Sequence, residues 1–154
     1  MDSYVDIGFH VTTSLILGCV IWKIFGSSDK KSLLVSLVFT FFGGVLIDID
    51  HFLDHFLSFG FNFNYDYFLN GEYFLRSHKA YIVLHAFEYV IIAGLLAFCL
   101  RDRKKKMIFY SLALGILSHL FIDIFLFPNP ISGYFILYRI SNGFNVDMSK
   151  GILE

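Results

Sequence analysis

Residues 33–53 read LLVSLVFTFFGGVLIDIDHFL, an apolar run that ends in two carboxylates and an imidazole. The run is long enough for a helix that crosses a bilayer, which takes about 20 residues. Its first part, residues 33–47, has almost no polar face, whereas helices of soluble proteins usually have one. The stretch therefore predicts a membrane-spanning helix that carries Asp48, Asp50 and His51 at one end.

Three further apolar segments of similar length lie at about residues 7–25, 81–100 and 107–127. The chain as a whole is 56% hydrophobic and only 16% charged, with a mean hydropathy of +0.66. Short polar breaks join the segments in pairs, so each pair is an antiparallel hairpin. We expect an all-α, integral membrane four-helix bundle that forms a single domain over residues 1–154. A soluble bundle with a very apolar core is the alternative.

Basic residues are concentrated at the two short connections. They flank the first loop at Lys23, Lys30 and Lys31, and they fill residues 101–106. The positive-inside rule places loops 26–32 and 101–106 in the cytoplasm and both termini outside. Residues 54–77 then also lie outside. They are rich in Phe, Tyr and Asn, and we expect an aromatic interfacial segment between the second and third helices, with Asp54 and His55 facing water.

Ionisable side chains are placed unevenly within the apolar segments. Such a group costs several kcal/mol unless it is paired or bound to a metal. At about 1.5 Å per helical residue, each lies roughly 15–30 Å from the basic loops, so all four segments bring such groups to the extracytoplasmic end. Imidazoles and carboxylates without thiolates are ligands of zinc, manganese or iron. The candidate metal ligands are His10, Asp48, Asp50, His51, His85, His119 and Asp123.

Helical spacing supports a shared site. His119 and Asp123 are i, i+4 and lie on one helix face. Asp48 and His51 at i, i+3 do the same, and so do His85 and Glu88 at i, i+3 on the expected third helix. Asp50 would point about 160° away from Asp48 on an ideal helix. If both acids join the site, the helix must end or distort there. Each group also has a simpler interpretation, namely a histidine bonded to a backbone carbonyl, a buried ion pair or a capped helix end.

Two motifs resemble those of a known family. Residues 44–51, GVLIDIDH, resemble the L-P-D-I-D-H signature of the YdjM-like membrane-bound metal-dependent hydrolases, and residues 118–123, SHLFID, resemble their S-H-x-x-x-D. His10 falls where the family has an early histidine. The chain departs from the pattern at Ile47, where the family has Pro, and at the family's middle H-R-x-x-T-H, whose nearest counterpart is His78-Lys79 with His85.

The resemblance implies phosphoester hydrolysis, since the family is similar to the zinc-dependent phospholipase C and single-strand nuclease enzymes. We expect a phospholipase-like, metal-dependent hydrolase in the cytoplasmic membrane that cleaves a lipid or lipid-linked phosphoester. Its cofactor would be two or three divalent ions, zinc first, with manganese or iron as alternatives. Candidates for a catalytic role are Asp50 and Glu88, the latter as a ligand or a general base. Candidates for binding the substrate are Arg76, His78 and Lys79.

The net charge and the depth of polar groups in the membrane bear on other classes of function. A net charge of −1 gives no basic footprint for nucleic acid. A metal transporter or channel is the first alternative, because intramembrane His and Asp also line ion paths. It would need polar groups through the whole membrane depth, and the cytoplasmic halves offer few. A non-catalytic membrane protein with a structural metal site is the second alternative.

Overall fold

The structure, a computed structural model, describes residues 3–25, 29–65, 68, 77–126 and 130–145. Over these residues it is all-helical, with one isolated antiparallel bridge between Lys79 and Asn145, so the all-α prediction is confirmed for them. The elements in chain order are α1 (Ser3–Phe25), α2 (Lys30–Gly44), the 3-10 turn η1 (Leu46–Ile49), α3 (Asp50–Phe59), α6 (Phe87–Cys99), α7 (Arg103–Leu126), the 3-10 turn η2 (Ile131–Tyr134) and α8 (Ile136–Ser141).

Two helices, α1 and α7, are long and apolar enough to cross a membrane. The pair formed by α2 and residues 46–59 meets the same test together, although it bends by 45°, so a third span is counted if the pair is one span. Helix α6 has only 13 residues, about 20 Å of helix against a hydrocarbon core of about 30 Å. The predicted third span over residues 81–100 is therefore not a continuous helix, and a four-span bundle is not confirmed.

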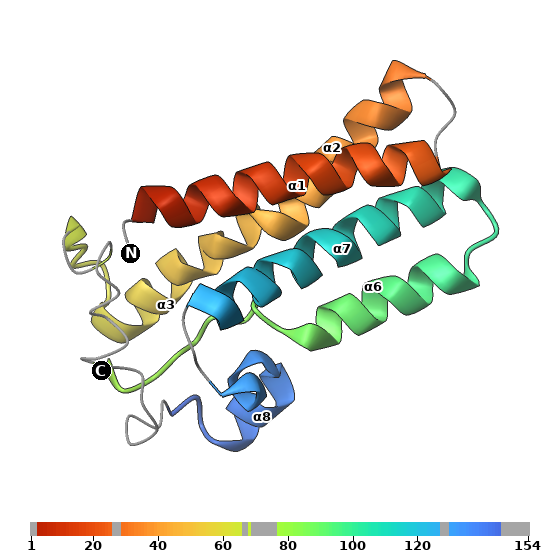
Figure 1. Cartoon of the computed structure of the whole chain (residues 1–154). Coiled ribbons are helices and arrows are strands. Elements are labelled where there is room, and N and C mark those ends of the chain that lie inside the picture. The colour runs from red at the N-terminus through yellow and green to blue at the C-terminus, as the bar shows by residue number, and fades with distance from the viewer. Residues whose placement is uncertain (1–2, 26–28, 66–67, 69–76, 127–129, 146–154) are drawn as a thin grey trace.

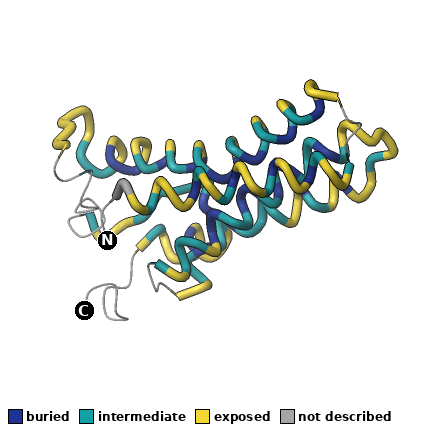
Figure 2. Tube along the Cα trace, turned by 45° about the horizontal axis from the view of Figure 1, so that its top comes forward, coloured by how far each residue is buried: buried dark blue, intermediate teal, exposed yellow. Residues whose placement is uncertain are grey.

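Helix α2 presents its small and hydroxyl side chains to the other helices. Its buried residues are Ser32, Ser36, Thr40, Gly43 and Gly44, while its large apolar side chains are exposed, such as Leu34 at 62% and Phe42 at 51%. Figure 2 shows exposed and buried positions alternating along the long helices. Small interfacial residues and an apolar exterior are typical of helices that pack within lipid, which is consistent with membrane association.

The contact between α2 and α7 depends on glycine. A Cβ atom added to Gly43 would lie 2.5 Å from the carbonyl oxygen of Leu112, and one added to Gly115 would lie 2.5 Å from that of Thr40. Hydroxyl groups add to the packing: Ser36 Oγ of α2 lies 3.1 Å from Ser111 Oγ of α7 and donates to the carbonyl of Gly18 in α1 at 2.8 Å. The two backbones therefore approach closely at the level where α2 ends.

The chain after α7 packs against the start of α6, beneath the long helices in Figure 1. Tyr134 of η2 is buried in the main apolar cluster with Ile47, Ile116 and Leu120. The two carboxylate oxygens of Glu88 accept hydrogen bonds from the backbone N–H groups of residues 136 and 137 at 3.1 Å each, which caps α8. This C-terminal unit is not among the elements that the sequence predicted.

Candidate metal centre

The predicted ligands meet at one end of the bundle. Helix α1 starts, α3 begins and α7 finishes at this end, whereas α1 meets α2 and α6 meets α7 at the opposite end (Figure 1). Three overlapping groups of ligand atoms form there, each with its members within 4.8 Å of one another. The groups are His10, His119 and Asp123; Asp48, His85 and His119; and Asp50, His51 and His85.

Four side chains from three parts of the chain converge at the centre of this cluster. His85 Nε2 and His119 Nε2 lie 3.0 Å apart. Each lies 3.2 Å from Asp48 Oδ1. Asp123 Oδ2 lies 3.2 Å from His119 Nε2 and 3.7 Å from His85 Nε2. We call His85, His119, Asp48 and Asp123 the central group.

The second ring nitrogen of His119 fixes which atom faces the centre. Its Nδ1 lies 3.0 Å from the carbonyl oxygen of Gly44, an acceptor only, so Nδ1 carries the hydrogen. In the neutral ring Nε2 then presents a lone pair to two carboxylates. Such an arrangement needs a proton or a metal cation between the groups. A histidine that donates through one nitrogen to a backbone carbonyl while the other faces the centre is typical of metal ligands.

His85 is held in the same way, by a carboxylate. Its Nδ1 lies 3.1 Å from Asp50 Oδ1, so Nε2 faces the central group. Burial disfavours the charged ring, but the hydrogen bonds to Asp48 and Asp50 outweigh this and raise the pKa of His85 to about 9. The carboxylates therefore favour a positive charge at the centre, whether a proton or a metal supplies it.

The break between α2 and α3 allows both acids to reach His85. Helix α2 ends at Gly44, residues 46–49 form a 3-10 turn, and α3 begins at Asp50. Asp48 then contacts one nitrogen of His85 and Asp50 contacts the other. The conditional prediction that the helix must end or distort here is confirmed.

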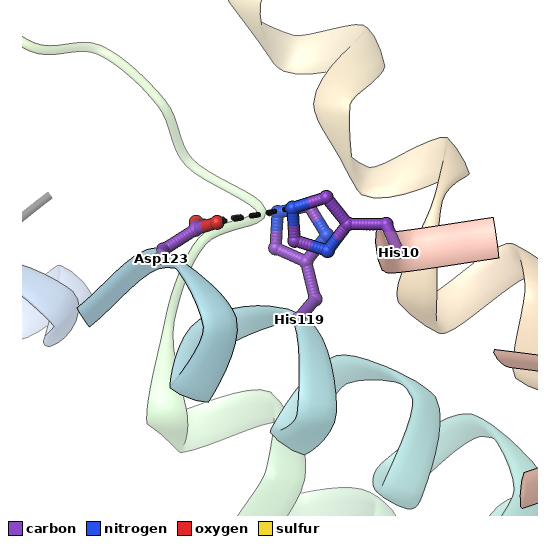
Figure 3. A group of neighbouring side chains, drawn as sticks. All are labelled: His10, His119 and Asp123. Atoms are coloured by element: carbon purple, nitrogen blue, oxygen red, sulfur yellow. Dashed lines mark ion pairs between the residues drawn. The ribbon is translucent and has the colours of Figure 1, made fainter. Parts of the chain in front are cut away.

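His10 lies beside His119 and forms a group of its own with His119 and Asp123. The two imidazole rings stack with centroids 3.9 Å apart, and Figure 3 shows Asp123 beside both. His10 Nε2 lies 3.3 Å from Asp123 Oδ1, while Asp123 Oδ2 faces His119. The two oxygens of Asp123 are thus divided between the groups, as in a carboxylate that bridges two metal ions.

The cluster is open on one side. His10, Asp50, His85 and His119 are buried, whereas the side chains of Asp48 and His51 are 38% and 25% exposed. His51 Nε2 lies 3.6 Å from Asp48 Oδ1. These two residues line the side from which water or a substrate can reach the centre.

The donor set fits a divalent transition metal. Metal–ligand distances of about 2.0–2.1 Å place neighbouring ligand atoms about 3.0 Å apart in an octahedral site and about 3.4 Å apart in a tetrahedral one. The distances from the two Nε2 atoms to each other and to the carboxylate oxygens of Asp48 and Asp123 range from 3.0 to 3.7 Å. Two imidazoles and two carboxylates are ligands of zinc, manganese and iron.

Several predicted site residues lie elsewhere. The two oxygens of Glu88 cap α8, so its carboxylate does not lie in the cluster. His85 and Glu88 do not share a helix face, because α6 begins only at Phe87. His78 and Lys79 are exposed and belong to none of the three groups. Arg76 lies outside the described residues.

Two residues expected in water are buried instead. Asp54 is 0% exposed and His55 1% exposed. Asp54 Oδ1 accepts a hydrogen bond from the backbone N–H of Tyr81 at 2.5 Å, and the His55 ring lies among phenylalanine rings such as Phe59 and Phe63. Both residues stabilise the junction of α3 with the segments that follow it, and neither belongs to the metal-ligand groups.

Sequence reasoning also missed two residues. Asp6 Oδ1 lies 3.2 Å from His10 Nε2, and its i, i+4 spacing on α1 could have indicated this contact. Arg139 is buried and donates to the backbone carbonyls of Ile82 and His85. The sequence feature that could have indicated its role is its position as a single arginine within the apolar run of residues 134–140. Burial lowers the pKa of Arg139, and the nearby Asp50 and Glu88 carboxylates oppose that shift.

No protein-family model, curated protein or solved structure matches the chain.

Proposed function

We propose that the chain is a membrane-embedded, metal-dependent hydrolase that cleaves a phosphoester in a lipid or lipid-linked substrate. One observation carries this proposal. The Nε2 atoms of His85 and His119 lie 3.0 Å apart, each with its other nitrogen held by an oxygen, and they face Asp48 and Asp123. Two Nε2 atoms at this distance repel each other if both carry a hydrogen, so the arrangement suits a divalent cation better than two imidazolium rings paired with the carboxylates.

The chain's own residues have separate parts in this proposal. The central group would hold the first metal, zinc in the first place. Asp123 would share its second oxygen with a further ion beside His10. A divalent cation supplies Lewis acidity, which activates water for attack and stabilises charge on a phosphoryl group. Asp50 and the carbonyl of Gly44 orient the two imidazoles, and the exposed side at Asp48 and His51 admits the substrate.

A lipid substrate is supported by the surroundings of the centre. A groove of about 290 Å³ lies between α6 and α7 and is lined by apolar side chains. Three lining residues lie close in sequence to cluster residues, since Ile47 precedes Asp48, Leu84 precedes His85, and Ile116 lies one turn before His119. A hydrocarbon chain in this groove would bring its head group to the metal ligands. The resemblance to the YdjM-like hydrolases supports the phosphoester as the bond that is cleaved.

The charge distribution supports an orientation. Residues 101–106 and the basic residues around the α1–α2 junction lie at the end of the bundle opposite the cluster. The positive-inside rule then favours a cytoplasmic location for that end and an extracytoplasmic location for the metal centre. The substrate would be reached from the outer leaflet.

The experiment uses the purified full-length chain in lipid nanodiscs. Its metal content is measured by elemental analysis, and hydrolysis is assayed on a panel of phospholipids and water-soluble phosphoesters with and without chelator. We expect activity that the chelator removes and zinc or manganese restores. His119→Ala should abolish activity and lower metal content while the chain still inserts into membranes, and His78→Ala, an exposed residue outside the cluster, should leave both unchanged. Full activity in His119→Ala would contradict the proposal.

A metal transporter is the alternative function. It would need polar groups along the helices beyond the metal centre, and a few buried hydroxyls lie there. Buried hydroxyls of Ser36, Thr40 and Ser111 extend from the centre along α2 and α7. They bond to backbone carbonyls and to one another, as helix-packing groups do. Metal uptake by proteoliposomes without hydrolysis of any phosphoester would favour the transporter.

A further inference from the structure

His85 differs from the other members of the central group in its backbone. Asp48 lies in a 3-10 turn, and His119 and Asp123 lie in the long helix α7. His85 precedes α6, in residues 80–86, which have no regular hydrogen-bonded structure. A ligand on such a segment needs other contacts to hold its ring within the tolerance of a metal site.

One set of contacts comes from α3. Asp54 Oδ1 accepts from the backbone N–H of Tyr81 at 2.5 Å, and Asp50 Oδ2 accepts from that of Leu84 at 2.6 Å. These two carboxylates hold the N–H groups of the segment on the side that faces α3.

The second set comes from the C-terminal unit. The guanidinium of Arg139 donates from Nη1 to the carbonyl of Ile82 and from Nη2 to that of His85, the latter at 2.8 Å. The backbone N–H of Ala80 donates to the carbonyl of Phe144 at 2.9 Å. Arg139 is only 6% exposed. It therefore holds the carbonyl of the ligand residue itself and one carbonyl three residues earlier.

Glu88 fixes the helix from which Arg139 projects. Its carboxylate accepts from the backbone N–H groups of Ile136 and Leu137. Glu88 lies three residues after His85 in sequence, so the contacts of Arg139 and of Glu88 with each other's segments both hold the backbone close to His85. The chain from His85 to Glu88 is thus held by α8 at two points.

We propose that Arg139 is a positioning residue for the metal centre: its two hydrogen bonds fix the backbone at His85, so that the imidazole faces the other ligands. Docking of α8 through Glu88 supports it. The proposal rests on the metal centre of the proposed function and concerns metal affinity, not the bond that is cleaved. The hydrogen bonds of Arg139 go to the backbone carbonyls of Ile82 and His85 and not to the ligand atoms of the central group.

A planar guanidinium can hold two carbonyls at once in a fixed fork, and a lysine ammonium cannot. Removing a partner that orients a ligand lowers metal affinity by about 10–100-fold. We therefore expect Arg139→Gln to lower affinity within this range and Arg139→Lys to lower it less. Glu88→Gln, which replaces one acceptor oxygen by an NH2 group, should also lower it less.

The test titrates the metal-free full chain in nanodiscs with Co²⁺ alone, followed by the visible absorption of the bound ion. Arg101→Gln, an exposed arginine at the opposite end of the bundle, is the matched control and should bind Co²⁺ as the native chain does. Unchanged Co²⁺ affinity in both Arg139→Gln and Arg139→Lys would overturn the proposal. If Arg139→Gln does not fold, Arg139→Lys and Glu88→Gln decide, because each keeps a polar side chain of similar length at its position.

A double-mutant cycle separates positioning from a general loss of structure. In a His85→Ala background, Arg139→Gln should change Co²⁺ affinity by no more than about twofold, because the group that it positions is gone. An equal loss in both backgrounds would show a structural role and overturn the proposal. Failure of the proposed function looks different: the native chain would bind metal and show the Arg139 effect but hydrolyse no phosphoester. A native chain that binds no metal would overturn both.

Discussion

The Nε2 atoms of His85 and His119 lie 3.0 Å apart, although the two residues are 34 positions apart in the sequence. Neither ring can turn away without losing a bond at its other nitrogen, to Asp50 in one case and to the carbonyl of Gly44 in the other. The two lone pairs, together with Asp48 and Asp123, therefore define one point for a cation.

The contact of Asp50 with His85 should control metal affinity. Asp50 Oδ2 accepts both from the backbone N–H of Leu84 and from His85 Nδ1. Asp50→Asn can keep both contacts but removes the negative charge that holds the His85 ring in this orientation and makes it a stronger metal ligand. We expect about a 10–100-fold loss of Zn²⁺ affinity, measured by competition with a chromogenic chelator. Asp54→Asn is the control, because its remaining carbonyl oxygen can still accept from Tyr81. Equal affinities in the two variants would argue against orientation by Asp50.

The close approach of α2 and α7 should not tolerate a side chain. In Gly43→Ala the new Cβ atom would lie 2.5 Å from the carbonyl oxygen of Leu112. We expect the free energy of unfolding to fall by about 1–3 kcal/mol, measured by denaturation in detergent micelles. Gly94→Ala in α6 is the matched control, since nothing lies within 4 Å of the added atom. A stable Gly43→Ala variant would show that the helices can separate without cost.

Metal binding should depend on pH in a defined direction. The neighbouring carboxylates raise the pKa of His85 to about 9 in the metal-free protein, so below that pH its ring carries a proton that a metal must displace. Apparent Zn²⁺ affinity should therefore rise with pH up to about 9, by about tenfold per unit for each proton released. Calorimetry in buffers of different ionisation enthalpy counts these protons. Binding without proton release would contradict this account of the ligand atoms.

The apolar groove should set the preference for long-chain substrates. Ala93 lines it and is 5% exposed, so Ala93→Phe would fill part of its volume of about 290 Å³. We expect hydrolysis of long-chain phospholipids to fall by about tenfold or more, with metal content and hydrolysis of a water-soluble phosphoester unchanged. Ile91→Phe, on the exposed side of α6, is the control. An equal loss on both substrates would mean that the groove does not bind the hydrocarbon chain.

The sequence predicted which imidazoles and carboxylates lie close together better than it predicted the helices that carry them. His119 and Asp123 are four residues apart in one uninterrupted helix, so their common face followed from helical geometry alone. The prediction that His85 lies on one helix face with Glu88 was wrong, because α6 begins only at Phe87. Apolar periodicity cannot distinguish an extended buried segment from a buried helix, and residues 81–86 are held by side chains from α3 and α8.

The sequence by itself determined the apolar character of the long helices and the gathering of imidazoles and carboxylates at one end. These features follow from local composition and from a rise of about 1.5 Å per residue. Only the tertiary structure decided which nitrogen of each imidazole faces the centre, that Glu88 caps α8, and that Arg139 holds the backbone of His85. Those contacts join residues up to 75 positions apart, and they depend on how closely two backbones pack, which no local pattern records.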